Sequence, residues 1–152
     1  MNEMTLAEAK TWMREHIDEG THCLCCTQFA KIYKRNVNAT MARSLIALYR
    51  AYGREFGSLP DLRRKVGLHH SNQEATMAYW KLIEEEPTVR EDGGRAGFWR
   101  VTDLGERWIL RQTTIPKYAR VYDGRCLGHR GDPVTIIDAL GERFNYWELM
   151  RR

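Results

Sequence analysis

Three of the four cysteines lie within four residues of each other near the start of the chain. Cys23 and Cys26 form a Cys-x-x-Cys pair, the spacing that lets two thiolates bind one zinc ion tetrahedrally. A structural zinc site needs four ligands, and Cys126 and His129, at Cys-x-x-His spacing, could complete it. The sequence alternatives for the missing ligands are His16, His22, Cys25 and the same cysteine pair of a second subunit. Zinc is therefore the candidate cofactor.

Two other interpretations of these cysteines stay open. The thiols could be half-buried and act as small apolar side chains. A redox role fits less well, because thioredoxin-type pairs follow a strand and begin a helix in an α/β setting that this sequence does not suggest. Disulfide bonds are not expected in the reducing compartment that we predict for the protein.

No arrangement of residues indicates catalysis. The sequence has no glycine-rich phosphate loop, no Gly-x-Ser-x-Gly motif and no His-Glu-x-x-His motif. His69 and His70 are adjacent, so their side chains point in different directions and are not expected to share a metal. Cys25 near His22 lacks an identifiable third group that would orient a nucleophile. We expect a protein without enzymatic activity.

Length, composition and charge limit the class of protein. The chain has 152 residues, which is the length of one domain, and its 43% hydrophobic content argues against disorder. No apolar run approaches the roughly 20 residues that span a bilayer, and no secretory signal is present, so we expect a cytoplasmic protein with no membrane partner. The net charge of +4 is uneven: residues 31–57 carry six bases and one acid, and residues 58–111 carry nine of each.

Capping residues and apolar periodicity predict the helices. Thr5 with Glu8 has capping-box spacing, and Ser58 precedes Pro60 and Asp61 as a cap does. Gly67 allows a sharp turn, and Thr102 can cap a later helix. The helices expected on these grounds cover residues 6–17, 40–52, 59–66, 71–86 and 104–111.

Strand-like segments surround a glycine-rich tip at residues 91–95. Residues 88–90 and 98–101 are rich in β-forming side chains and should form a hairpin around this tip. A second hairpin is expected at residues 118–128, turning at 123–124. Residues 132–137 fit either a short strand or a helix that starts at proline, and an aromatic segment closes the chain.

The predicted fold is α+β and mostly α, in three parts. Residues 1–38 form an N-terminal helix and the cysteine pair. Residues 39–111 form a winged helix-turn-helix, with the longer helix at 71–86 as the recognition helix and the hairpin as the wing. Residues 112–152 form a β-hairpin and an aromatic helix that pack on this core.

The middle of the chain resembles a known family. Trp80-Lys81-Leu82-Ile83-Glu84, the acidic-glycine tip 91–95 and the run 99–105, which ends Thr102-Asp103-Leu104-Gly105, are similar to the winged helix of MarR-type bacterial regulators, over residues 59–110. Lys81 stands where that family usually has glycine, and the family's long dimerisation helices are not evident. The whole chain also resembles small uncharacterised phage or prophage proteins with a Cys-rich N-terminus.

The resemblance implies a DNA-binding protein, such as a small phage or bacterial transcription regulator. Phosphate attraction supplies most non-specific DNA binding, and Asn and Gln side chains can bond an adenine edge. The residues predicted to contact duplex DNA are Lys31, Lys34, Arg35, Asn72, Gln73, Thr76, Arg90 and Arg95.

A second hypothesis comes from the outer face of the predicted recognition helix. Met77 and Trp80 fall on that face, where large apolar side chains suggest a protein partner. The protein would then be an interaction module, such as a phage-encoded inhibitor or adaptor of a host protein, and a homodimer is also a candidate assembly. Two alternatives stay open for these residues: contact with the terminal segments, or a helix buried on all sides.

Overall fold

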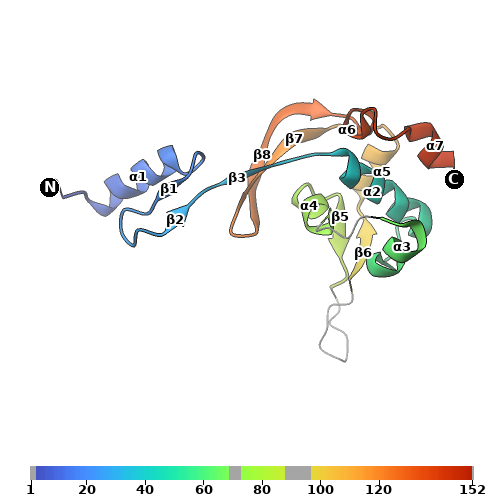
Figure 1. Cartoon of the computed structure of the whole chain (residues 1–152), viewed down its shortest axis with the longest axis horizontal. Coiled ribbons are helices and arrows are strands. Elements are labelled where there is room, and N and C mark those ends of the chain that lie inside the picture. Colours follow the sequence, from blue (N-terminus) through green and yellow to red (C-terminus); the bar gives the residue numbers. More distant parts are fainter. Residues whose placement is uncertain (1–2, 69–72, 88–96, 152) are drawn as a thin grey trace.

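The structure, a computed structural model, describes residues 3–68, 73–87 and 97–151 (Figure 1). Helices hold 42% of it and strands 26%, so the fold mixes α and β, and the expectation of a mostly α chain is not supported. Within these ranges the strands form three small antiparallel sheets. None of the helices in these ranges is long and apolar enough to cross a membrane.

The N-terminal unit consists of α1 (Leu6–His16) and the hairpin of β1 (Thr21–His22) and β2 (Phe29–Ala30). Thr5 caps α1 as predicted, since its hydroxyl accepts the amide of Glu8 at 3.1 Å. Figure 1 shows this unit at one end of the molecule, joined to the rest through β3 (Tyr33–Asn36).

The middle segment alternates helices with short strands. Its elements are α2 (Ala39–Tyr52), β4 (Gly57–Ser58), α3 (Leu59–Val66), α4 (Gln73–Tyr79), β5 (Ile83–Glu85), β6 (Phe98–Val101) and α5 (Asp103–Ile109). The three strands form a sheet in the order β4-β6-β5. Ser58 and Thr102 cap α3 and α5, and Gly67 ends α3 in the left-handed conformation, all as predicted. The predicted wing tip at 91–95 lies outside the described residues.

The predicted helix at 71–86 is shorter in the structure, because α4 ends at Tyr79. Lys81 takes a left-handed conformation with a φ of 57°, and its amide donates to the carbonyl of Ala78 at 2.9 Å. The amide of Leu82 then donates to Met77 at 3.2 Å. These bonds close the helix and turn the chain, so residues 83–85 pair with β6 as a strand.

The C-terminal segment contains β7 (Ile115–Tyr122), β8 (Arg125–Val134), α6 (Ile136–Leu140) and α7 (Tyr146–Arg151). β7 and β8 form the expected hairpin, and β3 joins it, giving a sheet in the order β3-β7-β8. Of the two alternatives for residues 132–137, the strand holds as far as Val134, where β8 ends. The helix α6 that follows is capped by Thr135 and does not start at proline.

One hydrophobic core connects the middle and C-terminal segments. Leu45 on α2 and Trp108 on α5 are fully buried, together with Ala119 on β7 and Ile136 on α6. The indole Nε1 of Trp108 donates to the carbonyl of Val134 at 2.9 Å. The core therefore crosses the boundary expected near residue 111, and it holds the β3-β7-β8 sheet firmly against the helices.

Candidate functional site

The sheet β3-β7-β8 gathers cationic side chains on one face. Lys34 pairs with Arg120, and Asn36, Tyr118 and Arg130 are aligned across the three strands. Residues directly opposite each other in an antiparallel pair share a face of the sheet. Three cations from three strands therefore share this surface, which we call the cationic face. A cavity here is lined by Lys34, Tyr118, Arg120 and Arg130 with Ile32, Asp18 and Glu19.

Tyr118 organises the cationic face. The Nζ atoms of Lys34 and Lys117 lie 4.6 Å and 5.5 Å from its ring centroid, which is cation–π distance. A Cβ atom at Gly131 would lie only 2.6 Å from the Tyr118 ring, so glycine lets the ring lie close to β8. Lys117 precedes Tyr118 at a register shift of the β7-β8 pair and does not line the cavity, but its ammonium group, like that of Lys34, lies beside this ring.

Ion pairs with carboxylates neutralise four arginines of the middle segment, while six other described cations there form none: Arg43, Arg50, Lys65, Lys81, Arg107 and Arg111. The ion pairs of the middle segment are Arg54 with Asp103 and Glu106, Arg63 with Glu74, Arg64 with Asp61, and Arg100 with Glu84. On the cationic face, Arg120 pairs with Asp18 at 2.9 Å. Lys34, Lys117 and Arg130 form no ion pair within the described ranges. Their charge is available for a ligand.

The predicted cluster of Lys31, Lys34 and Arg35 is split by the strand. Successive side chains of a strand point to opposite faces, so Lys34 belongs to the cationic face and Arg35 to the other, opposite Ala119. Lys31 precedes β3, and its Nζ lies 5.4 Å from the ring centroid of Tyr33. Only Lys34 of the three joins the cationic face, which corrects the idea of a single local patch.

The predicted groove contacts of the recognition helix lie at the start of α4. Gln73 is its first residue, and Thr76 is half-buried. Glu74 pairs with Arg63 on α3, which places a carboxylate at this end of the helix. Asn72, Arg90 and Arg95 lie outside the described residues.

Met77 and Trp80 do not form an exposed interaction surface, which corrects the second hypothesis. Their exposed fractions are 0% and 3%. The indole Nε1 of Trp80 donates to the carbonyl of Pro116 at 2.7 Å, and its ring lies 6.0 Å from that of His129. The helical pattern assigned both to the outer face, which is wrong, because both belong to the hydrophobic core, while Ala78 and Tyr79 of the predicted inner face are only partly buried. The β7-β8 hairpin contacts Trp80 directly. Contact with the terminal segments is the alternative that the structure supports.

The four predicted zinc ligands do not come together within one chain. Cys126 Sγ lies 3.6 Å from Nε2 of His129, and that nitrogen also lies 2.8 Å from the carbonyl oxygen of Tyr79. Cys23 and Cys26 lie in the turn between β1 and β2, which is distant from the β7-β8 turn in Figure 1. No group of three or more His, Cys, Asp or Glu side chains that could hold a metal occurs among the described residues.

The cysteine pair nevertheless has ordered local geometry. All four cysteines are free thiols. The pKa of the Cys23 thiol is lowered, chiefly by hydrogen bonds from the backbone amides of Cys26 and then Cys25, because these donors favour the thiolate. The Cys25 amide lies 3.4 Å from the Cys23 sulfur.

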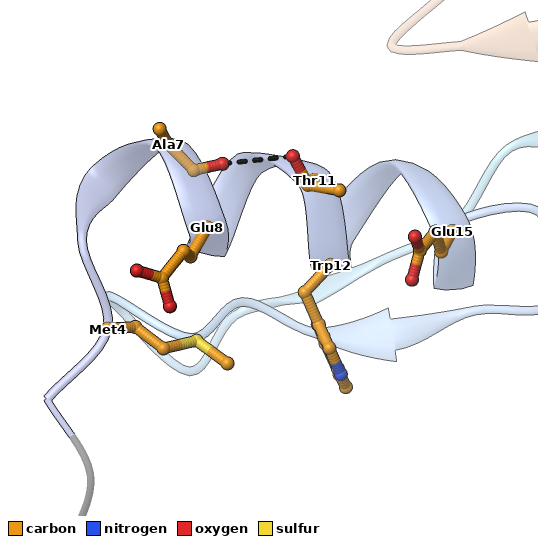
Figure 2. Close-up of a pocket in the computed structure, with 6 residues that line it drawn as sticks. All are labelled: Met4, Ala7, Glu8, Thr11, Trp12 and Glu15. Carbon is orange, nitrogen blue, oxygen red and sulfur yellow. Dashed lines mark hydrogen bonds between the residues drawn. The ribbon is translucent and has the colours of Figure 1, made fainter.

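A groove along one side of α1 is unsuited to anions. Figure 2 shows Met4, Ala7, Glu8, Thr11, Trp12 and Glu15 around it. The Thr11 hydroxyl donates to the carbonyl of Ala7 at 3.1 Å, and Trp12 stacks on His16 with ring centroids 4.1 Å apart. Glu8 and Glu15 would repel phosphate, so this groove is separate from the cationic face in its chemistry.

Sequence reasoning missed Lys117, Tyr118 and Arg130, although residues 118–122 were expected to form a strand. The alternation of Tyr118, Arg120 and Tyr122 along that strand was the available signal, but the strand pairs with β3, which is distant in the sequence.

Comparison of the chain with protein-family models, with curated proteins and with solved structures gives no match.

Proposed function

We propose that the protein binds duplex DNA, with the cationic face contacting the phosphate backbone, and acts as a small phage or bacterial transcription regulator. The observation that carries the proposal is the set of unpaired cations around Tyr118: Lys34 from β3, Lys117 from β7 and Arg130 from β8. Cations that no carboxylate neutralises are those that release counterions from DNA when they bind phosphate.

The scaffold of this proposal is a winged helix at residues 39–111. Its support is the element order helix, strand, two helices and two strands, with β6 central in the sheet. The Thr102 hydroxyl donates to the carbonyl of Lys81 at 2.6 Å and accepts the amide of Gly105 at 3.0 Å. A Cβ at Gly105 would lie 2.2 Å from the carbonyl oxygen of Leu82, so this Thr-x-x-Gly segment requires glycine where it meets the turn after α4.

The packing of α4 limits how the protein can read DNA. Met77 is buried in the core and Trp80 is held by the carbonyl of Pro116 on β7, so these two side chains at the C-terminal end of α4 are not available to a groove. Base contacts in this proposal come from the first turn of α4, where Thr76 lies, and most of the affinity comes from phosphates. Binding should therefore be weakly sequence-specific and strongly dependent on salt.

The test is fluorescence anisotropy of a labelled mixed-sequence duplex at several salt concentrations. Three phosphate contacts correspond to a slope of log K against log salt of about −2.7, or about 40-fold weaker binding at 200 mM than at 50 mM salt. A slope near zero, or no binding at low salt with micromolar protein, would contradict the proposal.

A further inference from the structure

The turn between β1 and β2 is folded around the sulfur of Cys23. The amide of Cys23 donates to the carbonyl of Gln28 at 2.8 Å, and the amide of Thr27 donates to the carbonyl of Cys23 at 2.9 Å. Within the turn that these two hydrogen bonds close, the Cys25 amide lies 3.4 Å from the Cys23 sulfur. Hydrogen bonds from backbone amides to a sulfur orient a thiolate so that it can bind a metal.

Thr27 shows that this turn is held in a costly conformation. Its φ is 65°, in the left-handed region that a β-branched residue rarely adopts. Such strain persists only where surrounding bonds enforce it, and it is common at binding sites. Here it closes the loop directly after Cys26, so the turn holds an exposed Cys26 and a half-buried Cys23.

The other described residues of the chain do not complete a metal site at this turn. Nδ1 of His16 lies 2.7 Å from the carbonyl oxygen of Trp12, and Nδ1 of His22 lies 3.1 Å from that of Thr27. His129 is held on β8 by the end of α4. No third His, Cys, Asp or Glu joins the pair anywhere in residues 3–68, 73–87 and 97–151. Each chain thus offers two thiol ligands where zinc requires four.

We propose that the cysteine pair binds zinc between two copies of the chain. Cys23 and Cys26 of each copy would supply the four thiolates of a tetrahedral site on a two-fold axis. A two-fold interface brings the same patch of both subunits together, so two identical half-sites become one complete site. Binding one Zn²⁺ releases the thiol protons to solvent and forms four Zn–S bonds, with no change of oxidation state.

The surface beside the turn fits a second copy. A groove between α1 and the turn is lined by Leu6, Ala9, Lys10, Met13, Arg14, Cys23, Leu24 and Cys25. Leu6 is 64% exposed and Leu24 is 44% exposed, so both have apolar surface to bury. A two-fold arrangement around the zinc would bury this apolar surface of each copy against the other.

The distribution of charge also favours the groove between α1 and the turn as the interface. Zinc with four thiolates carries a net charge of −2, which needs nearby cations when water is excluded. Lys10 and Arg14 line this groove, whereas Glu8 and Glu15 line the groove on the other side of the helix (Figure 2). The cationic side therefore suits the metal-bridged interface.

The experiment measures zinc content and mass on the purified full chain without DNA. Native mass spectrometry should show two chains with one zinc, and a chelator should convert this species to zinc-free single chains. Cobalt in place of zinc should give the intense thiolate charge-transfer absorption of a four-sulfur site. The double variant Cys23→Ser/Cys26→Ser should lose metal and dimer together, while Cys25→Ser and the pair Cys126→Ser/His129→Ala keep both.

Several results would overturn the inference. One zinc in a single chain would place all ligands within that chain, and loss of zinc from Cys126→Ser/His129→Ala would assign ligands to β8. A dimer that survives metal removal, or a chain that neither binds added zinc nor dimerises with it, would also refute it. If a variant fails to fold, metal removal from the unaltered protein with a chelator still tests the inference. None of these measurements uses DNA, so their outcome is independent of whether the proposed function is correct.

Discussion

Nε2 of His129 on β8 lies 2.8 Å from the carbonyl oxygen of Tyr79, the last residue of α4. This contact joins the C-terminal hairpin to the end of the helix that sequence patterns nominate for recognition. The adjacent Trp80 donates to the carbonyl of Pro116 at 2.7 Å, so α4 is held by both strands of the hairpin. Trp80 therefore stabilises the fold and is not free to bind a partner.

Replacing Trp80 with alanine should destabilise the protein. Loss of a buried indole should lower the free energy of unfolding by about 3–5 kcal/mol. Trp147→Ala is the matched control, because Trp147 is 56% exposed and its removal should cost under about 1 kcal/mol. Urea denaturation followed by circular dichroism measures both. Equal stability of the two variants would show that Trp80 is not buried under the hairpin.

Lys81→Gly should stabilise the protein. Lys81 has a φ of 57°, and a left-handed conformation costs a non-glycine residue about 1–2 kcal/mol, part of which glycine recovers. Lys65→Gly removes the same side chain from helix α3 and should instead cost about 0.5–1 kcal/mol. Thermal denaturation should therefore shift in opposite directions for the two variants. A lower melting temperature for Lys81→Gly would contradict the assigned turn.

Stability should fall in alkaline solution partly through Tyr49. Burial raises the pKa of Tyr49 above its ordinary value of 10.0, and its hydrogen bond of 3.1 Å to Glu106 raises it further. Because the folded state binds this proton more tightly, its contribution is complete below pH 10 and is lost as the pH rises through the raised pKa. Tyr49→Phe should lose less stability than the unaltered protein over this range. Parallel pH profiles in urea denaturation would count against the burial of Tyr49.

Local signals in the sequence predicted much of the fold. Thr5, Ser58 and Thr102 each cap a helix as their side chains suggested, because capping depends on residues only three positions apart. The end of α4 was missed because Lys81 takes the left-handed turn that glycine usually marks.

The candidate site depends on contacts that periodicity does not report. The apolar pattern of the helix assigned Trp80 to the outer face because it does not report which segments, here the β7-β8 hairpin, pack against each side. Likewise, Lys34 meets Tyr118 only because β3 pairs with β7, and that register depends on the whole sheet. The cationic face therefore could be found only in three dimensions.

Charge reversal on the cationic face tests the central claim most directly. The variant Lys34→Glu/Arg130→Glu removes two unpaired cations from the sheet, and Lys65→Glu/Arg107→Glu makes the same charge change on α3 and α5. Both should be titrated into labelled duplex DNA at low salt, after circular dichroism confirms that they fold. The sheet variant should bind at least about 10-fold more weakly, with its salt slope reduced by about two, while the control changes far less. Equal losses, or a larger loss in the control, would contradict DNA binding by this sheet.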